Sequence, residues 1–258
     1  MTAPILVTGG TGTLGSIAVP LLEGSGAPVR VLTRRPRASA GGADYVVGDL
    51  ATGEGVDEAV RGARTVLHLA GGPKGDAEAT RTLVRAAARA GVQHLVHISV
   101  IGADRVPLAW FRSQAGAEQA VTESGIPWTI LRAAQFHDLT LSAVRAMAKL
   151  PVVPSPGGLR FQPVDPREVA ERLVELAGGE PAGRVPDLAG PRVYAMDELI
   201  RGYLSARGGR RPLVRIRIPG KAGRAYRAGE NLSVAGVRNA AVTTGGRSWE
   251  EFLAEAVG

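Results

Sequence analysis

The chain has 258 residues, of which 45% are hydrophobic and none is cysteine. This length suffices for one large α/β domain with a sizeable core, and the lack of cysteine excludes disulfide bonds, a thiol nucleophile and thiolate metal ligands. The formal net charge is +7, yet the basic residues are nearly all arginine and mostly scattered, and aromatic residues make up only 4%, so nucleic-acid binding is not expected.

The N-terminal stretch MTAPILVTGG lacks the basic region and the long apolar run of a signal peptide. No later stretch approaches the roughly 20 apolar residues that a membrane-spanning helix needs. We therefore expect a soluble, cytoplasmic protein with no membrane association.

Short apolar runs alternate with longer amphipathic segments over the first 150 residues. The predicted strands are 5–9, 29–33, 43–48, 65–70, 94–100 and 128–133, and the predicted helices are 12–23, 54–61, 76–90 and 107–124. Strands that are apolar on both faces and separated by helices indicate a parallel sheet covered on each side. With right-handed connections, this pattern predicts an α/β, Rossmann-like, doubly wound sheet.

The pattern becomes irregular and rich in proline and glycine from about residue 151. A helix is predicted over 165–177, with Asp165 as its N-cap and Pro166 in the first helical position. Further elements are predicted at 196–206, 213–218 and 248–256. We predict a core of residues 1–150 and a small C-terminal substrate-binding lobe, 151–258, packed over the C-terminal ends of the strands as part of one structural unit.

The segment TGGTGTLG (8–15) joins the first predicted strand to the first predicted helix. Its glycines permit a tight turn and a close approach of an anionic group to the backbone, and the start of the helix favours that anion. A strand before the glycines and a helix after them are the context that a dinucleotide-binding loop requires. The alternative is a tight turn without a ligand.

The end of the second predicted strand reads VRVLTRRPR, with no acidic residue. A site for NADH places Asp or Glu there, on the ribose 2′-hydroxyl, whereas a guanidinium can pair with the 2′-phosphate of NADPH. Thr33, Arg34 and Arg35 therefore predict NADPH in preference to NADH. Alternatively, the arginines belong to a solvated loop.

Several motifs together resemble the short-chain dehydrogenase/reductase superfamily: TGGTGTLG, GDL (48–50), HLAGG (68–72) and HISVIGAD (97–104). SGIPWTILRAAQFHD (124–138), PVDPREVA (163–170), DLAGPRVYAMDEL (187–199) and SWEEFLAEA (248–256) resemble its atypical, NmrA-like branch. The resemblance covers nearly the whole chain and implies a Rossmann fold, a nicotinamide cofactor and oxidoreductase activity.

The resemblance also implies a set of cofactor-binding positions. Asp49 and Leu50 would border the adenine, or Asp49 is a turn residue; Ser99 would lie beside the nicotinamide, or its hydroxyl caps the following loop. The full predicted set is Thr8, Gly9, Gly10, Thr11, Gly12, Thr13, Leu14, Gly15, Thr33, Arg34, Arg35, Asp49, Leu50, Ala70, Gly71, Gly72 and Ser99.

The helix after the fifth strand normally carries a Tyr-x-x-x-Lys pair in this superfamily, in which tyrosine supplies a proton and lysine lowers its pKa. Here the matching positions are Trp110 and Gln114. The chain has no tyrosine between residues 45 and 194 and no lysine between 74 and 149, so a shift of register does not restore the pair. The usual acid is predicted to be absent.

We expect the protein to bind a small-molecule substrate and to be a monomer or a homodimer. Three hypotheses follow for its function. The first is an NADPH-dependent reductase of a quinone-like or conjugated substrate, which delocalises the incoming charge. The second is an NADPH-binding redox sensor without turnover, and the third is a fold repurposed for a non-redox step on a natural product.

Under the first hypothesis, His137 is the candidate proton donor, since an ordinary histidine pKa suits acid catalysis; alternatively, it only starts a helix. Ser99 and Gln114 are the other catalytic candidates. The predicted substrate pocket comprises Trp110, Gln135, Phe136 and His137. No histidine or carboxylate spacing predicts a metal site.

Overall fold

The computed structural model describes residues 3–37, 41–72, 75–233 and 242–257, which form two compact units. Unit 1 comprises residues 1–99, 112–131 and 167–185, and unit 2 comprises residues 100–111, 132–166 and 186–258. The division predicted from the sequence has a single boundary at residue 150, whereas each of these units combines three separate segments of the chain. The segment 167–185 lies in unit 1 because it supplies a helix and an edge strand to the layers of that unit.

Unit 1 is built on a parallel sheet. Its strands run in the order β6-β5-β4-β1-β2-β3, with β9 beside β6. The strands are β1 (Ile5–Thr8), β2 (Val29–Thr33), β3 (Asp44–Val47), β4 (Thr65–His68), β5 (His94–Val100), β6 (Trp128–Ala133) and β9 (Gly183–Arg184). This order is that of a Rossmann sheet, so the predicted doubly wound fold is confirmed.

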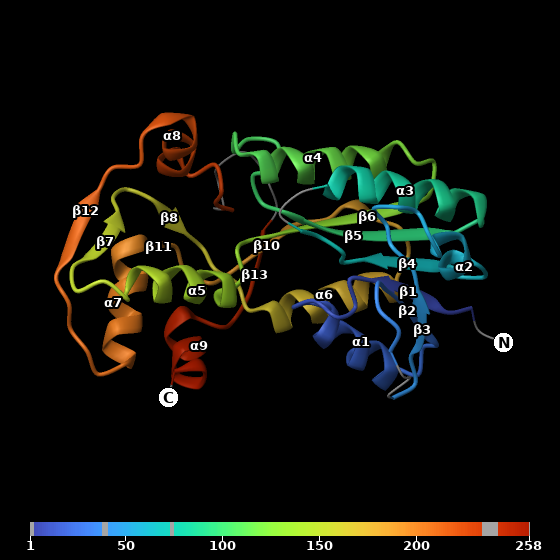
Figure 1. Cartoon of the computed structure of the whole chain (residues 1–258), viewed down its shortest axis with the longest axis horizontal. Helices are drawn as coiled ribbons and strands as arrows, with labels where there is room; N and C mark the ends of the chain where they lie inside the picture. The colour runs from blue at the N-terminus through green and yellow to red at the C-terminus, as the bar shows by residue number, and fades with distance from the viewer. Residues whose placement is uncertain (1–2, 38–40, 73–74, 234–241, 258) are drawn as a thin grey trace. The chain divides into compact units, whose positions relative to one another are not determined.

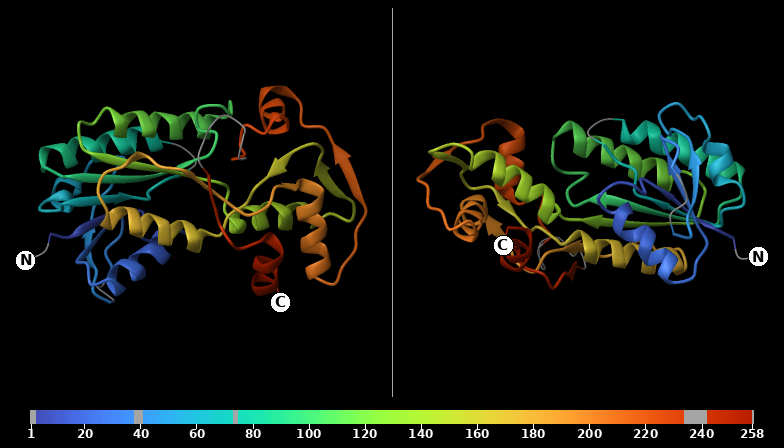
Figure 2. Two further views of the ribbon diagram at one scale, coloured as in Figure 1. Left: turned by 180° about the vertical axis from the view of Figure 1, so that it is seen from behind. Right: turned by 60° about the horizontal axis from the view of Figure 1, so that its bottom comes forward.

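Helices cover both faces of this sheet (Figure 1). Helices α3 (Asp76–Arg89) and α4 (Ala109–Thr122) lie on one face, with the short α2 (Val56–Val60) beside α3, and α1 (Gly15–Gly24) and α6 (Pro166–Gly178) lie on the other. The view from behind gives the same arrangement (Figure 2). Because both faces are covered, every residue of β4 is buried, which accounts for the continuous apolar runs in the sequence.

The core of unit 1 on the α2–α3 side joins residues from β4, β5 and β6 to residues of those helices, including Val66, Leu95, Ile130, Ala59 and Leu83. Burial of such side chains contributes roughly 25 cal/mol per Å² of apolar surface removed from water. The core therefore holds the carboxyl ends of β1 and β4 in fixed positions, and the loops that follow these strands form the site described below.

Unit 2 contains three helices that share a second hydrophobic core: α5 (His137–Met147), α7 (Met196–Ala206) and α9 (Trp249–Ala256). Leu141, Tyr194, Leu199, Trp249 and Phe252 are among its buried residues. The remaining elements are α8 (Gly220–Ala228) and three strand pairs: β7 (Val153–Pro156) with β12 (Leu213–Ile216), β8 (Arg160–Phe161) with β11 (Tyr194–Ala195), and β10 (Asp187–Ala189) with β13 (Val242–Thr244).

The predicted elements agree with the structure within a few residues. Helix α1 begins at Gly15, three residues later than predicted, because residues 12–14 belong to the glycine loop. Helices α5 and α8 were not predicted as full elements. Within the described residues, no helix is both long and apolar enough to cross a membrane.

Candidate cofactor site

The glycine loop between β1 and α1 is a close-packed turn in unit 1. Gly9 has φ of 70°, and the Gly12 N–H donates to the Gly9 carbonyl at 3.0 Å. A Cβ added to Gly15 would lie 2.2 Å from the Gly9 oxygen, and one added to Gly9 would lie 2.6 Å from the Ala70 nitrogen. These positions therefore accept no side chain, and the turn needs glycine both for its φ and for its packing.

A cavity of about 490 Å³ opens beside this loop, between residues that follow β1, β2, β3 and β4 in unit 1. The carboxyl ends of these parallel strands meet at one edge of the sheet, where ligands bind in such folds. Eleven of the predicted cofactor residues line the cavity: Thr8, Gly9, Thr11, Gly12, Thr33, Arg34, Asp49, Leu50, Ala70, Gly71 and Gly72. Six predicted residues do not line it: Gly10, Thr13, Leu14, Gly15, Arg35 and Ser99.

The turn after β2 separates the roles of its two arginines. The Thr33 hydroxyl donates to the Arg35 carbonyl at 3.1 Å, which fixes the turn, while Arg34 lines the cavity. The Arg34 side chain is exposed, and no carboxylate of the described residues pairs with it. Arg34 is therefore available to an anionic group of a bound ligand, whereas Arg35 lies outside the cavity wall.

Asp49 follows β3 at the same edge. Its Oδ1 accepts a hydrogen bond from the Ala51 N–H at 2.8 Å, as in a turn, and its other carboxylate oxygen has no partner in the described part of the chain. The free oxygen can accept from an amino group, and the adjacent Leu50 is buried, with 8% of its surface exposed. The turn and the adenine-binding interpretations of Asp49 are therefore compatible.

A buried hydrogen-bond chain runs beneath the cavity wall. The Ala70 N–H donates to Thr8 Oγ1 at 3.4 Å, and Thr8 Oγ1 is 2.7 Å from His68 Nδ1. On the other side of the ring, His68 Nε2 is 2.9 Å from Thr80 Oγ1, which donates to the Asp76 carbonyl at 2.7 Å. Since the Thr80 proton is committed to that carbonyl, His68 must be the donor at Nε2 and the acceptor at Nδ1.

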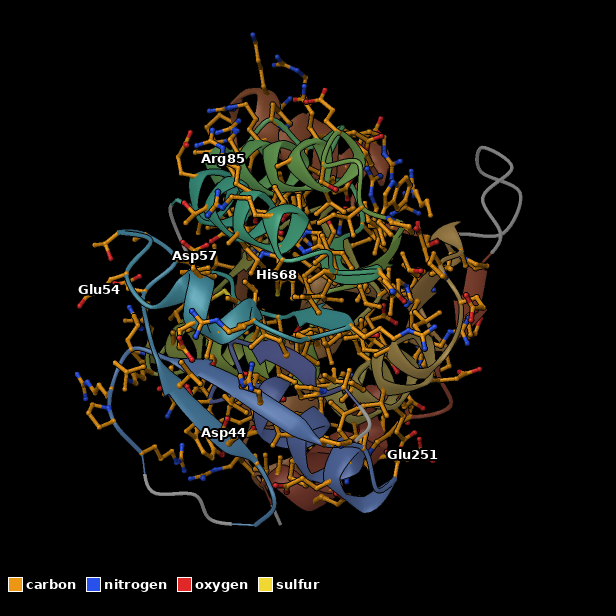
Figure 3. All side chains as sticks on the ribbon, turned by 90° about the vertical axis from the view of Figure 1, so that its right-hand side faces the viewer. Asp44, Glu54, Asp57, His68, Arg85 and Glu251 are labelled. Atoms are coloured by element: carbon orange, nitrogen blue, oxygen red, sulfur yellow. The ribbon has the colours of Figure 1, made fainter. Side chains whose placement is uncertain are left out.

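His68 is fully buried within unit 1, in contrast to the peripheral Glu54 (Figure 3). It stacks on His97 with ring centroids 5.0 Å apart. Burial lowers the pKa of His68 well below its usual value, and the neighbouring His97 lowers it further. Burial also lowers the pKa of His97 to about 4, so both rings are neutral near pH 7.

Asp76 begins α3 and lines the same cavity. Its Oδ1 accepts from the Gly72 N–H at 2.8 Å, and its Oδ2 accepts from Gln114 Nε2 of α4. Burial raises the pKa of Asp76, while the hydrogen bonds from Gly72 and Gln114 oppose that shift. Gln114 is the residue that the sequence resemblance matched to the superfamily lysine, and its amide nitrogen donates to Asp76.

The remaining catalytic and substrate candidates divide between the two units. Ser99, in unit 1, is buried, and its hydroxyl has no hydrogen-bond partner among the described residues. In unit 2, Trp110 is half-buried against Phe111, with ring centroids 5.0 Å apart. Gln135 and Phe136 precede α5; both are half-buried, and the Gln135 amide has no partner among the described residues.

His137 is the first residue of α5, which agrees with the alternative interpretation of this residue as a helix start. Its ring is fully buried in unit 2, with centroids 4.9 Å from Phe252 and 5.9 Å from Trp249. A ring enclosed in this way has no exposed surface from which to pass a proton to a ligand. The surroundings therefore do not support its role as an acid.

Three polar residues of the site were not predicted: His68, Asp76 and Thr80. The contacts of His68 with Thr8 and Thr80, and of Asp76 with Gln114, join residues 12 to 60 positions apart, which local sequence patterns do not reveal. Asp76 did have a signal, since an acidic residue at a helix start follows the glycine pair by four residues. Across the described residues, no group of histidine, aspartate or glutamate is arranged to hold a metal ion.

A family model described as NAD(P)H-binding matches residues 9–177. The chain is 35% identical over 201 residues to the (4-alkanoyl-5-oxo-2,5-dihydrofuran-3-yl)methyl phosphate reductase of Streptomyces griseus, with 75% of this chain and 70% of the relative covered. It is 29% identical over 213 residues to the NAD(P)H azoreductase of Xenophilus azovorans, with 80% and 74% covered.

Among solved structures, the NADPH-dependent quinone oxidoreductase of Escherichia coli in complex with NADPH superposes with a TM-score of 0.82. The match covers 98% of this chain and 100% of that chain at 17% identity. At this identity the likeness concerns the fold, and it agrees with the sheet order described above.

Proposed function

Because the chain belongs to the NAD(P)H-binding family, in the atypical, NmrA-like branch of the short-chain dehydrogenases/reductases, and is an NAD(P)H-dependent oxidoreductase, we propose that it uses NADPH to reduce a conjugated or quinone-like small molecule. When bound, the cofactor supplies a hydride, and the acceptor takes both electrons. A proton from solvent then completes the reduction.

The residues of the cavity fit this cofactor. Gly9 and Gly12 line the cavity without side chains, and α1 begins at Gly15, directly behind the loop, with no acidic residue in its first turn. The preference for NADPH is supported by Arg34, an exposed cavity residue that no carboxylate of the described residues pairs with. A guanidinium in this setting suits a ribose phosphate.

The choice of acceptor rests on one observation, the amino-acid sequence of α4. The sequence resemblance matches Trp110 and Gln114 of this helix to the tyrosine and lysine positions of the superfamily, and the Gln114 amide donates to Asp76. This helix therefore carries no tyrosine that could protonate a developing alkoxide. A substrate that spreads the incoming charge over a conjugated system does not need one.

The activities named for these two relatives are consistent with this class of acceptor. One reduces a dihydrofuran carrying oxo and alkanoyl groups, and the other is an azoreductase. Both kinds of molecule delocalise a negative charge. We extend the class, and not the individual substrates, to this chain.

The experiment mixes purified protein and NADPH with a panel of quinones, enones and azo compounds and follows the loss of nicotinamide absorbance. Simple aliphatic ketones and aldehydes form the matched set of acceptors that do not delocalise charge. Oxidation with the first set and not with the second is expected. Turnover of the simple ketones at equal rates would refute the proposal.

Two other outcomes identify the alternative functions. Tight NADPH binding without oxidation across the whole panel would indicate a cofactor-sensing protein. Conversion of a substrate without any loss of NADPH would indicate a non-redox reaction in which the cofactor is structural.

A further inference from the structure

The loop 70–72, between β4 and α3, lies between the glycine loop and the start of α3 within unit 1. Gly9 approaches it so closely that a Cβ there would lie 2.6 Å from the Ala70 nitrogen. The loop and Gly9 line the same cavity. A shift of this loop would therefore change the space available to a cofactor.

Each end of the loop is held by a different side chain. At Ala70, the N–H donates to Thr8 Oγ1, the first member of the His68 chain. At Gly72, the N–H donates to Asp76 Oδ1 at 2.8 Å. Since Asp76 is only 6% exposed, this second contact is largely protected from competition by water.

Gln114 completes the arrangement from α4. A carboxylate only accepts hydrogen bonds, so the amide end that faces Asp76 must be the NH₂ group. Gln114 is 7% exposed, and its contact with Asp76 spans 38 residues of sequence. The helix position that resembles the lysine position of the superfamily therefore serves to orient a carboxylate.

We infer that Asp76 and Gln114 are a positioning pair that fixes the Gly71–Gly72 backbone for cofactor binding. Gln114 orients Asp76, and Asp76 holds Gly72 through its backbone N–H. This inference deepens the proposed function and rests on it for the identity of the cofactor. The pair acts on affinity for NADPH and takes no part in hydride or proton transfer.

The first test is Gln114→Glu, which places a second buried carboxylate opposite that of Asp76. Two ionised carboxylates in one buried site repel and separate, so NADPH should bind roughly 10-fold or more weakly, and the loss should grow as pH rises because a proton shared by the pair would restore the contact at lower pH. The double variant Asp76→Asn/Gln114→Glu should restore the dissociation constant to within about threefold of the parent, because the Asn amide can donate to Glu while its oxygen accepts from Gly72. Fluorescence titration of NADPH measures both.

Gln119→Glu is the matched control, since it is the same substitution on the exposed side of α4 and should leave NADPH binding unchanged. Hydrogen exchange at the Gly72 amide, measured without cofactor, should be faster in Gln114→Glu and return to the parent rate in the double variant. If Gln114→Glu does not fold, Asp76→Asn alone still tests the inference, because Gln114 can rotate its amide to accept from Asn and binding should be retained.

Two results would overturn the inference. One is a Gln114→Glu variant that folds and binds NADPH as the parent does even at alkaline pH, where the pair cannot share a proton. The other is a double variant that binds no better than Gln114→Glu, which would mean that the Asp76 carboxylate itself contacts the cofactor. These titrations need no acceptor, so they stand even if no compound of the reductase panel is turned over.

Discussion

Replacing Arg34 with alanine should weaken the binding of NADPH and leave that of NADH nearly unchanged. Arg34 lines the cavity, and no described carboxylate pairs with it, so its guanidinium is free to meet a 2′-phosphate. Only NADPH carries that phosphate. The difference between the two dissociation constants therefore isolates this single interaction.

The exposure of Arg34 sets the size of the effect. Two unit charges about 4 Å apart attract by about 1 kcal/mol in water and about 4 kcal/mol at the effective dielectric of a protein surface. Because Arg34 is exposed at the cavity edge, a value between these limits applies, about 2 kcal/mol. This corresponds to a roughly 30-fold higher dissociation constant for NADPH.

The assay is fluorescence titration of both reduced cofactors at fixed ionic strength. Arg37→Ala is the matched control, because Arg37 lies in the same segment, is exposed, and stacks 5.7 Å over the Tyr45 ring outside the cavity. Added salt should reduce the effect of the Arg34 substitution. Equal losses for NADPH and NADH in Arg34→Ala, or no loss for either, would refute the reasoning.

Two further predictions concern stability. Gly15→Ala should lower the free energy of unfolding by about 1–3 kcal/mol and weaken NADPH binding, because the new Cβ would lie 2.2 Å from the Gly9 oxygen; thermal unfolding measures the change. The free energy of unfolding should also fall as pH falls from 6.5 toward 4. The unfolded chain then takes up protons that folded His97, with its pKa of about 4, and folded His68 do not, giving up to about 1.4 kcal/mol per pH unit for each ring.

Each of these predictions has its control. Gly24→Ala, at the end of α1, meets nothing within 4 Å and should leave unfolding unchanged or slightly raise its free energy. Equal unfolding temperatures for Gly15→Ala and Gly24→Ala would contradict the packing argument. For the pH dependence, His97→Phe should have a smaller slope between pH 6.5 and 4 in urea denaturation, and a slope equal to that of the parent would show that His97 does not contribute.

Much of unit 1 could be predicted because its signals are local. Both β5 and β6 have the bounds that their β-branched and apolar residues predicted, and α3 ends just before Gly91, which has φ of 73°. The glycine loop was located by the strand and helix that flank it. The start of α1 was placed too early, since the same glycines that mark the loop also occupy the residues before the helix.

The parts that were not predicted depend on contacts between distant segments. Asp76 is a site residue because Gln114, 38 positions later, faces it, and His68 because Thr8 and Thr80 lie on its two sides. His137 was singled out by its place after a strand, yet the chain packs Phe252, more than 100 residues later, against its ring. Such packing depends on the tertiary fold and cannot be predicted from the neighbouring sequence.

The two units are interleaved along the chain, which limits how gene segments can be exchanged between related proteins. The backbone passes from one unit to the other five times, at 99/100, 111/112, 131/132, 166/167 and 185/186. No contiguous fragment encodes either unit: a fragment of residues 1–150 would lack α6 and would leave β6 without its neighbour β9. Exchange of a single contiguous gene segment therefore cannot replace one whole unit while keeping the other.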